Sequence, residues 1–217
     1  KNILKNDIDE NINKIPYSEL TFIKKYGKTF LLNENKKIPI KIFGKHNMQN
    51  LGGAQKVLNQ LGIDNKLFYK AIKTFKLPHQ RLEILYDKSN KKIFKDFAHS
   101  PSKLKSTINA VKNQYKKKLL SIYELHSSSS LNKKFLPTYK NSISESDYSI
   151  IYISNKILFE RNLDKILYSD IKNFFNVSNF KICRNPNDLF KHISNNKFSD
   201  FNFLFMSSGN FDGFSIK

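Results

Sequence analysis

Two short motifs and one arginine supply the residues that could bind a nucleotide. The first motif, Gly44-Lys45-His46-Asn47-Met48-Gln49-Asn50, lies between a strand pattern and a helix pattern. The second, Asp96-Phe97-Ala98-His99-Ser100-Pro101, follows a strand and opens another helix, and Arg81 lies between the two in sequence. Asparagine amides can pair with the edge of an adenine, an aspartate can accept hydrogen bonds from ribose hydroxyls, and an arginine can hold a phosphate. The residue types and their order therefore favour a nucleotide site.

Hydrophobic periodicity predicts the elements that must position these residues. Three β-like runs come first, at 21–26, 28–32 and 38–43, and helices follow at 47–61 and 66–75, with Gly62 ending the first and Asp64 capping the second. Strand patterns then occupy 81–86, 92–96, 119–125, 148–154, 180–183 and 201–206, and helix patterns occupy 102–115, 133–143, 169–175 and 187–193. This alternation predicts an α/β fold with a doubly wound, mostly parallel sheet, whose ligands bind at the carboxyl ends of the strands.

Composition narrows the class of protein. The 217 residues allow one domain and part of a second, and the start without a methionine indicates a cut from a longer protein. The net charge of +20 comes almost entirely from lysine, with arginine only at positions 81, 161 and 184, so we expect solvated faces and no nucleic-acid partner. No apolar run approaches the ~20 residues of a membrane span, and the single cysteine, Cys183, is typical of a reducing cytoplasm. We therefore expect a cytoplasmic protein without a membrane partner.

The two motifs resemble those of the Mur ligases, the ATP-dependent family that builds the peptide of the bacterial cell wall and so serves cell shape and division. Mur ligases carry a His-Asn-x-x-Asn element at the start of a linker helix and an Asp/Tyr-Ala-His-x-Pro element at a strand end, and both are present here. The stretch Leu77–Glu83 is similar to the family's x-Arg-x-Glu segment. The resemblance covers essentially the whole chain. It implies a Rossmann-like C-terminal domain at 79–217, a helical linker region at 46–78, and at 1–45 a small β remnant of the central ATP-binding domain.

The resemblance also implies roles for six residues at an ATP site. Asn47 and Asn50 would reach the adenine, Arg81 the phosphates and Asp96 the ribose. His99 would position the phosphates or the incoming amine, and His46 would either join the site or only satisfy the helix N-terminus. The family's phosphate loop, Mg²⁺ carboxylate and UDP-sugar domain would lie upstream of Lys1, so no catalytic or metal-binding residue is expected here.

Two later segments are similar to the family's pocket for the incoming amine. Glu124–Lys133 occupies a strand-end loop, and Met206–Gly213 resembles the Met-Ser-Asn-Gly-Gly-Phe-Gly-Gly ending of the tripeptide-joining murein peptide ligases, with Asp212 in place of a glycine. The amine-pocket residues expected from these segments are His126, Asn132, Lys133, Ser208 and Asn210. The alternative is that such side chains only cap the next helix and turn.

The implied activity is the amide-forming step of peptidoglycan synthesis or recycling. With ATP and Mg²⁺, a carboxylate of UDP-N-acetylmuramate would become an acyl phosphate that a peptide or amino acid amine attacks; the upstream domains are the expected partners, and the chain alone should be inactive. One alternative is the sibling activity on L-alanine. Others, from different classes, are a basic nucleic-acid-binding module and a decayed, non-catalytic remnant.

Overall fold

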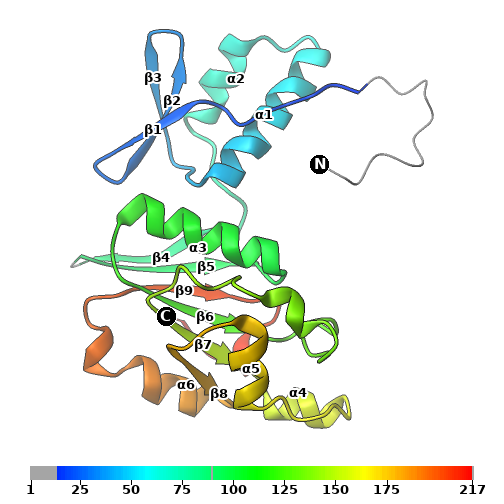
Figure 1. Ribbon diagram of the computed structural model, residues 1–217. Coiled ribbons are helices and arrows are strands. Elements are labelled where there is room, and N and C mark those ends of the chain that lie inside the picture. The colour runs from blue at the N-terminus through cyan, green and yellow to red at the C-terminus, as the bar shows by residue number, and fades with distance from the viewer. Residues whose placement is uncertain (1–13, 89, 217) are drawn as a thin grey trace.

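The described part of the chain forms two β-sheets with helices packed against each of them (Figure 1). The computed structural model describes residues 14–88 and 90–216. A three-stranded antiparallel sheet comes first and is built from β1 (Phe22–Lys25), β2 (Lys28–Asn33) and β3 (Lys36–Ile40). Helices α1 (Lys45–Gln60) and α2 (Asn65–Ile72) pack on it through one apolar cluster. The three predicted strands and two predicted helices are thus confirmed, with shifts of a few residues at their ends.

Local chemistry sets the ends of α1 and α2. Gly44, with φ of 93°, precedes α1, and Gly62, with φ of 78°, follows it. The amide of Gly62 donates to the Asn59 carbonyl at 3.2 Å, and the next amide reaches the Leu58 carbonyl at 3.0 Å, which is the Schellman pattern of a helix C-terminus. Asp64 then accepts a hydrogen bond from the amide of Leu67 at 2.8 Å and caps α2 as predicted.

The second sheet has six strands in the order β4-β5-β9-β6-β7-β8. Their bounds are β4 (Glu83–Lys88), β5 (Lys91–Asp96), β6 (Leu119–Glu124), β7 (Tyr148–Tyr152), β8 (Phe180–Cys183) and β9 (Asn202–Met206). Only the β4–β5 pair is antiparallel, and every other neighbouring pair is parallel. The last strand, β9, lies between β5 and β6, so the ends of β5, β9 and β6 meet at one edge. The predicted mostly parallel α/β fold is confirmed.

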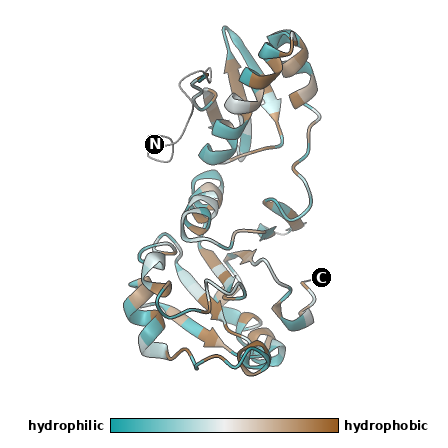
Figure 2. Cartoon of the chain, turned by 90° about the vertical axis from the view of Figure 1, so that its right-hand side faces the viewer, coloured by the Kyte–Doolittle hydropathy of each residue, from teal (hydrophilic) through white to brown (hydrophobic). Residues whose placement is uncertain are grey.

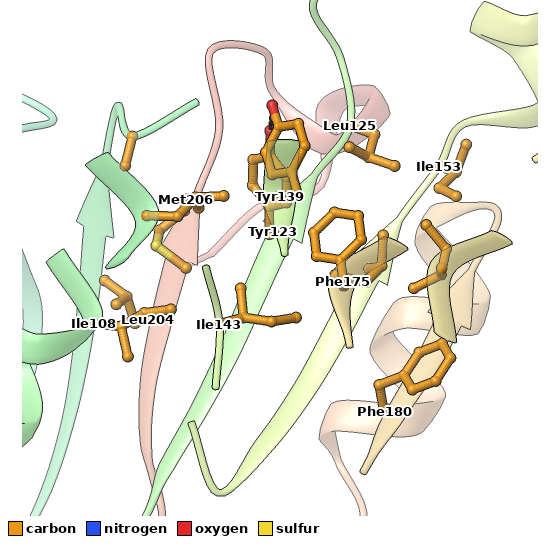
Figure 3. Packing of buried hydrophobic residues seen from close by; sticks show 14 of the residues in the cluster. Ile108, Tyr123, Leu125, Tyr139, Ile143, Ile153, Phe175, Phe180, Leu204 and Met206 are labelled. Atoms are coloured by element: carbon orange, nitrogen blue, oxygen red, sulfur yellow. Dashed lines mark hydrogen bonds between the residues drawn. The ribbon is translucent and has the colours of Figure 1, made fainter. Parts of the chain in front are cut away.

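Helices cover both faces of this sheet. One face carries α3 (Pro101–Tyr115), the 3₁₀ turn η1 (Leu136–Tyr139), α4 (Asn155–Glu160) and α5 (Tyr168–Phe175), and the other carries α6 (Pro186–Ile193) and two more 3₁₀ turns. In Figure 3, Ile108 of α3 meets Leu204 of β9, while Tyr139 lies over β6 with Phe175 beside it. The side view of Figure 2 shows α3 between the larger sheet and the part of the chain that holds α1. No helix in the described ranges is long and apolar enough to cross a membrane.

The helix predicted at 133–143 is wrong. This segment contains only η1, and several of its amides bond three residues back, as those of Thr138 to Phe135 at 3.0 Å and Ser142 to Tyr139 at 2.9 Å do. Pro137 has no amide to donate, and the buried Tyr139 anchors the turn by donating its hydroxyl proton to the carbonyl of His99 at 2.9 Å. The structure also adds α4, which the sequence analysis did not predict.

Candidate functional site

One cavity of about 520 Å³ brings together residues from three separated stretches of the chain. It lies between the N-terminal turns of α1 and α3, beside the end of β5. Five of the six residues predicted for ATP line it: His46, Asn47, Asn50, Arg81 and Asp96. Lys103, Ser102, Ser106 and Thr107 of α3 complete its polar lining. His99 is not among the lining residues.

The polar side chains from the first turns of α1 that line this cavity differ in exposure, hydrogen bonding and charge. Asn47 is 8% exposed and donates from Nδ2 to the carbonyl of Phe43 at 2.8 Å, so part of its amide is already used. Asn50 is exposed one turn further on. Burial lowers the pKa of His46 below its ordinary value of 6.5, although the nearby Asp96 charge opposes this shift. His46 therefore faces the cavity as a neutral imidazole at pH 7.

Asp96 is engaged by the protein's own donors. It is 7% exposed, and its Oδ2 accepts from the amide of Leu82 at 2.8 Å. Its Oδ1 accepts from the amide of Ala98 at 2.8 Å and from the hydroxyl of Thr107 at 3.3 Å. Burial raises the pKa of Asp96, and these hydrogen bonds act against the rise. Asp96 thus ties the end of β5 to the turn that carries Arg81.

Arg81 lies in a tight turn that is fixed from both sides. Its neighbours Gln80 and Leu82 have positive φ values of 58° and 45°, a conformation that side chains disfavour. Glu83 accepts from the amide of Gln80 at 3.1 Å and contacts His79 Nδ1 at 2.8 Å. The carbonyl of Gln80 also accepts from the amide of Phe97 at 2.8 Å. The Arg-x-Glu pattern therefore has a local reason, because the glutamate closes the turn that presents the arginine.

His99 contacts Phe97 on the loop that follows β5. Its Nδ1 is 2.9 Å from the carbonyl of Phe97, and the two rings meet edge to face with centroids 5.2 Å apart. The guanidinium of Arg81 lies over the same Phe97 ring at 5.8 Å. The His99 carbonyl accepts from the hydroxyls of Tyr123 at 3.0 Å and Tyr139 at 2.9 Å. The structure thus places His99 on the Arg81 side of the site but outside the cavity.

The five residues predicted for the amine pocket do not line one common cavity, unlike the residues of the candidate ATP site. Asn132 accepts from the amide of Lys134 at 2.9 Å, and Asn210 accepts from the amide of Gly213 at 3.2 Å, so both side chains cap turns. Lys133 pairs with Asp170 of α5 at 3.2 Å. Asn132 and Asn210 thus make contacts of the capping kind and Lys133 makes an ion pair, while their place in an amine pocket stays a prediction.

His126 and the loop that contains Ser208 meet at the ends of β6 and β9. A Cβ placed on Gly209 would lie 2.7 Å from Cγ and from Nδ1 of His126, so this loop lies directly against the imidazole. Ser208 is partly exposed in the same loop.

Glu124 lies at the same place but was not among the predicted site residues. It ends β6, its side chain is fully buried, and its Oε2 accepts from the hydroxyl of Ser207 and from the amide of Phe211 at 3.0 Å. A glutamate that ends an apolar strand, two residues before a histidine, was the available signal. Its partners lie 83 and 87 residues further along the chain, so the sequence indicated a shared sheet edge but not these particular hydrogen bonds.

Within residues 14–88 and 90–216 there is no group of three or more His, Cys, Asp and Glu side chains that could hold a metal ion. The Asp96 carboxylate is occupied by backbone and threonine donors, and the Glu124 carboxylate is buried.

Sequence comparison finds relatives among the UDP-N-acetylmuramate–L-alanine ligases, although no family model matches the chain. The UDP-N-acetylmuramate–L-alanine ligase of Fusobacterium nucleatum is 26% identical over 180 residues, which cover 78% of this chain and 38% of that enzyme. The chain therefore spans well under half the length of this relative.

Structure comparison finds the same fold in two solved ligases. The UDP-N-acetylmuramate–alanine ligase of Thermotoga maritima matches with a TM-score of 0.66 and 16% identity, over 91% of this chain and 44% of that one. The murein peptide ligase of Psychrobacter arcticus matches with a TM-score of 0.57 and 21% identity, over 86% and 39%. In sequence and in fold, this chain is similar to one part of the Mur ligases.

Proposed function

We propose that the chain is the C-terminal part of an ATP-dependent ligase of peptidoglycan synthesis or recycling. The whole enzyme joins the amine of an amino acid or peptide to UDP-N-acetylmuramate. The observation that carries the proposal is the convergence of His46, Asn47, Asn50, Arg81 and Asp96 on one polar cavity, although they come from stretches far apart in sequence. The ligase relatives point to the same chemistry.

The lining of this cavity suits the adenosine and phosphate parts of ATP. Asn50 and the free part of the Asn47 amide supply donors and acceptors for an adenine edge. Arg81 and Lys103 supply positive charge for phosphates, and Arg81 is presented by a rigid turn. Bound ATP supplies the phosphoryl group that activates the sugar carboxylate. The neutral His46 adds a polar wall that does not change the charge of the site at pH 7.

The same proposal assigns the rest of the chain. Residues 1–45 are the tail of the central ATP-binding domain, of which 1–13 lie outside the described residues; 46–78 are the helical linker and 79–217 the C-terminal domain. The phosphate loop, the Mg²⁺ ligands and the UDP-sugar domain belong to the remaining part of the enzyme, and the reaction takes place in the cytoplasm.

Nucleotide binding to the chain itself tests the proposed site. ADP is titrated into the ¹⁵N-labelled 217-residue chain, and the side-chain amides of Asn47 and Asn50 are followed by NMR. We expect saturable shifts at both amides, weakened at least about tenfold by Arg81→Ala, which is about 1.4 kcal/mol. Arg161→Ala is the matched control, because Arg161 donates to the His126 carbonyl, away from the cavity. Shifts that ignore Arg81, or that fall elsewhere, would contradict the site.

The activity is tested in the longer enzyme that contains this chain. Phosphate release is measured with ATP, Mg²⁺ and UDP-N-acetylmuramate, with L-alanine or the tripeptide L-alanyl-γ-D-glutamyl-meso-diaminopimelate as the amine. We expect release that depends on one of these amines, and background release from the 217-residue chain alone. The amine that supports turnover identifies the subfamily. If neither amine supports phosphate release above background, the ligase proposal is refuted.

A further inference from the structure

The carboxylate of Glu124 faces the imidazole of His126 at the carboxyl end of the central strands. The Glu124 side chain is fully buried, whereas the His126 side chain is 29% exposed. Glu124 Oε1 and His126 Nδ1 lie 3.6 Å apart, and each is a buried polar atom without a hydrogen-bond partner among the described residues. Buried polar atoms in proteins are nearly always paired, because an unpaired one loses its hydrogen bonds to water and gains none in return. The two unpaired atoms therefore point to each other as partners.

The orientation of the carboxylate is fixed by its other oxygen. Oε2 accepts from the Ser207 hydroxyl and from the Phe211 amide, which hold the glutamate to the end of β9 and to the loop after it. Two donors on one oxygen match a carboxylate, which only accepts. Oε1 is consequently held toward the histidine ring.

Gly209 closes the loop over this pair. A Cβ at this position would lie 2.7 Å from His126 Nδ1 and 2.9 Å from Glu124 Oε2, closer than real Cβ atoms come. The ring is thus confined between the carboxylate and the backbone of the loop. Because Nδ1 is its buried nitrogen, the ring turns Nε2 outward.

The chemistry of the two groups selects one tautomer. A neutral imidazole carries its proton on one nitrogen and a lone pair on the other. A lone pair on Nδ1 would face the carboxylate and be repelled, whereas an N–H there can donate to Oε1 after a small rotation. We infer that Glu124 is a positioning residue that keeps the His126 proton on Nδ1, so that Nε2 accepts a hydrogen bond from the incoming primary amine. The identity of the ligand rests on the proposed function, whereas the tautomer does not.

The tautomer of His126 is directly measurable in the 217-residue chain. Long-range ¹H–¹⁵N correlation spectra at alkaline pH distinguish the Nδ1–H and Nε2–H forms, and the other four histidines serve as references. We expect the Nδ1–H form in the wild type. Glu124→Gln places an amide that can donate opposite Nδ1, so it should move His126 toward the Nε2–H form. An Nε2–H ring in the wild type, which would suit a carboxylate ligand, would overturn the inference.

A matched variant separates this effect from loop anchoring. Ser207→Ala removes one hydrogen bond to Oε2 and leaves Oε1 and Nδ1 in place. We expect it to keep the Nδ1–H form. A switch in Ser207→Ala equal to that in Glu124→Gln would show that the loop, and not the carboxylate, sets the tautomer, and would overturn the positioning role.

The longer enzyme supplies the second readout. Glu124→Gln should lower kcat/KM for the amine by about tenfold or more while the KM for ATP stays near the wild-type value, because the ATP cavity does not include Glu124. An unchanged kcat/KM would refute the role in amine binding. An Nδ1–H tautomer in a protein that proves to have no ligase activity would leave the positioning intact and refute the proposed function.

Discussion

The histidine of the first motif differs from an exposed histidine because it is partly buried beside a carboxylate. Burial is the larger influence and lowers the pKa of His46 below 6.5, while the Asp96 charge acts in the opposite direction. A histidine that stays neutral in the fold contributes stability above the pKa of the unfolded chain. That contribution is lost as pH falls through the lowered folded pKa, because the unfolded state takes up the proton first.

His46→Gln should therefore change how stability depends on pH. We expect the stability advantage of the wild type over the variant to be larger at about pH 7.5 than at about pH 5.5. The reason is that the contribution of the neutral His46 decreases once the pH falls below the unfolded pKa of 6.5. Urea unfolding of both proteins at the two pH values measures this difference. An advantage that stays constant or grows as the pH falls would contradict the lowered pKa.

At the scale of elements, Asp96 connects the end of β5 with the Arg81 turn. Asp96→Ala leaves the buried amides of Leu82 and Ala98 without their acceptor, and unpaired buried donors cost ~1–3 kcal/mol each. We expect the free energy of unfolding to fall by about 2 kcal/mol or more. Asp96→Asn keeps one acceptor oxygen and should cost less.

A surface aspartate serves as the control for this prediction. Asp200 pairs with Lys117 at 3.1 Å but its side chain is 69% exposed, so Asp200→Ala should change stability by about 0.5 kcal/mol or less. Urea unfolding at neutral pH measures all three variants. Equal losses in Asp96→Ala and Asp200→Ala would show that the β5–turn connection is not a stabilising one.

The sequence predicted best the features that depend on neighbours in the chain. The Asp64 cap and the Gly62 ending each need only residues within one helical turn, and both are present as predicted. The sequence failed at 133–143, where Pro137 and the tertiary hydrogen bond of Tyr139 prevail over an apolar spacing that suits a helix. Glu124 was missed for the same reason, because its partners come from the end of β9.

At the candidate ATP site too, features that depend on nearby residues were predicted and features that depend on tertiary contacts were not. The motifs indicated which residues would gather, and the cavity brings five of the six together. They did not reveal that Asp96 already binds two amides and a hydroxyl, because Leu82 and Thr107 lie 14 and 11 residues away and reach it only through the fold. The motifs therefore predicted which residues lie together better than they predicted the hydrogen bonds of those side chains.

At the scale of the whole molecule, the strong positive charge calls for an explanation separate from the site. The chain has 38 basic and 18 acidic residues, and only three of the basic ones are arginine. Several lysines lie over aromatic rings, such as Lys91 over Phe203 at 4.0 Å, and others pair with carboxylates, such as Lys112 with Asp147 at 2.6 Å. These lysines make contacts within the protein itself. Lysine also lacks the planar guanidinium with which arginine forms paired hydrogen bonds to guanine and phosphate.

Nucleic-acid binding by the 217-residue chain should accordingly be weak and governed by counterion release. We expect micromolar or weaker affinity for duplex DNA and for RNA of unrelated sequences at roughly physiological salt, with the logarithm of the binding constant falling linearly with that of the salt concentration. Fluorescence anisotropy with two unrelated oligonucleotides across a salt series measures both affinity and slope. Adding ADP should not compete, because the lysines are spread over the surface and the proposed nucleotide cavity is local. Tight binding to one sequence that survives added salt would contradict this view and favour a nucleic-acid-binding module over the ligase.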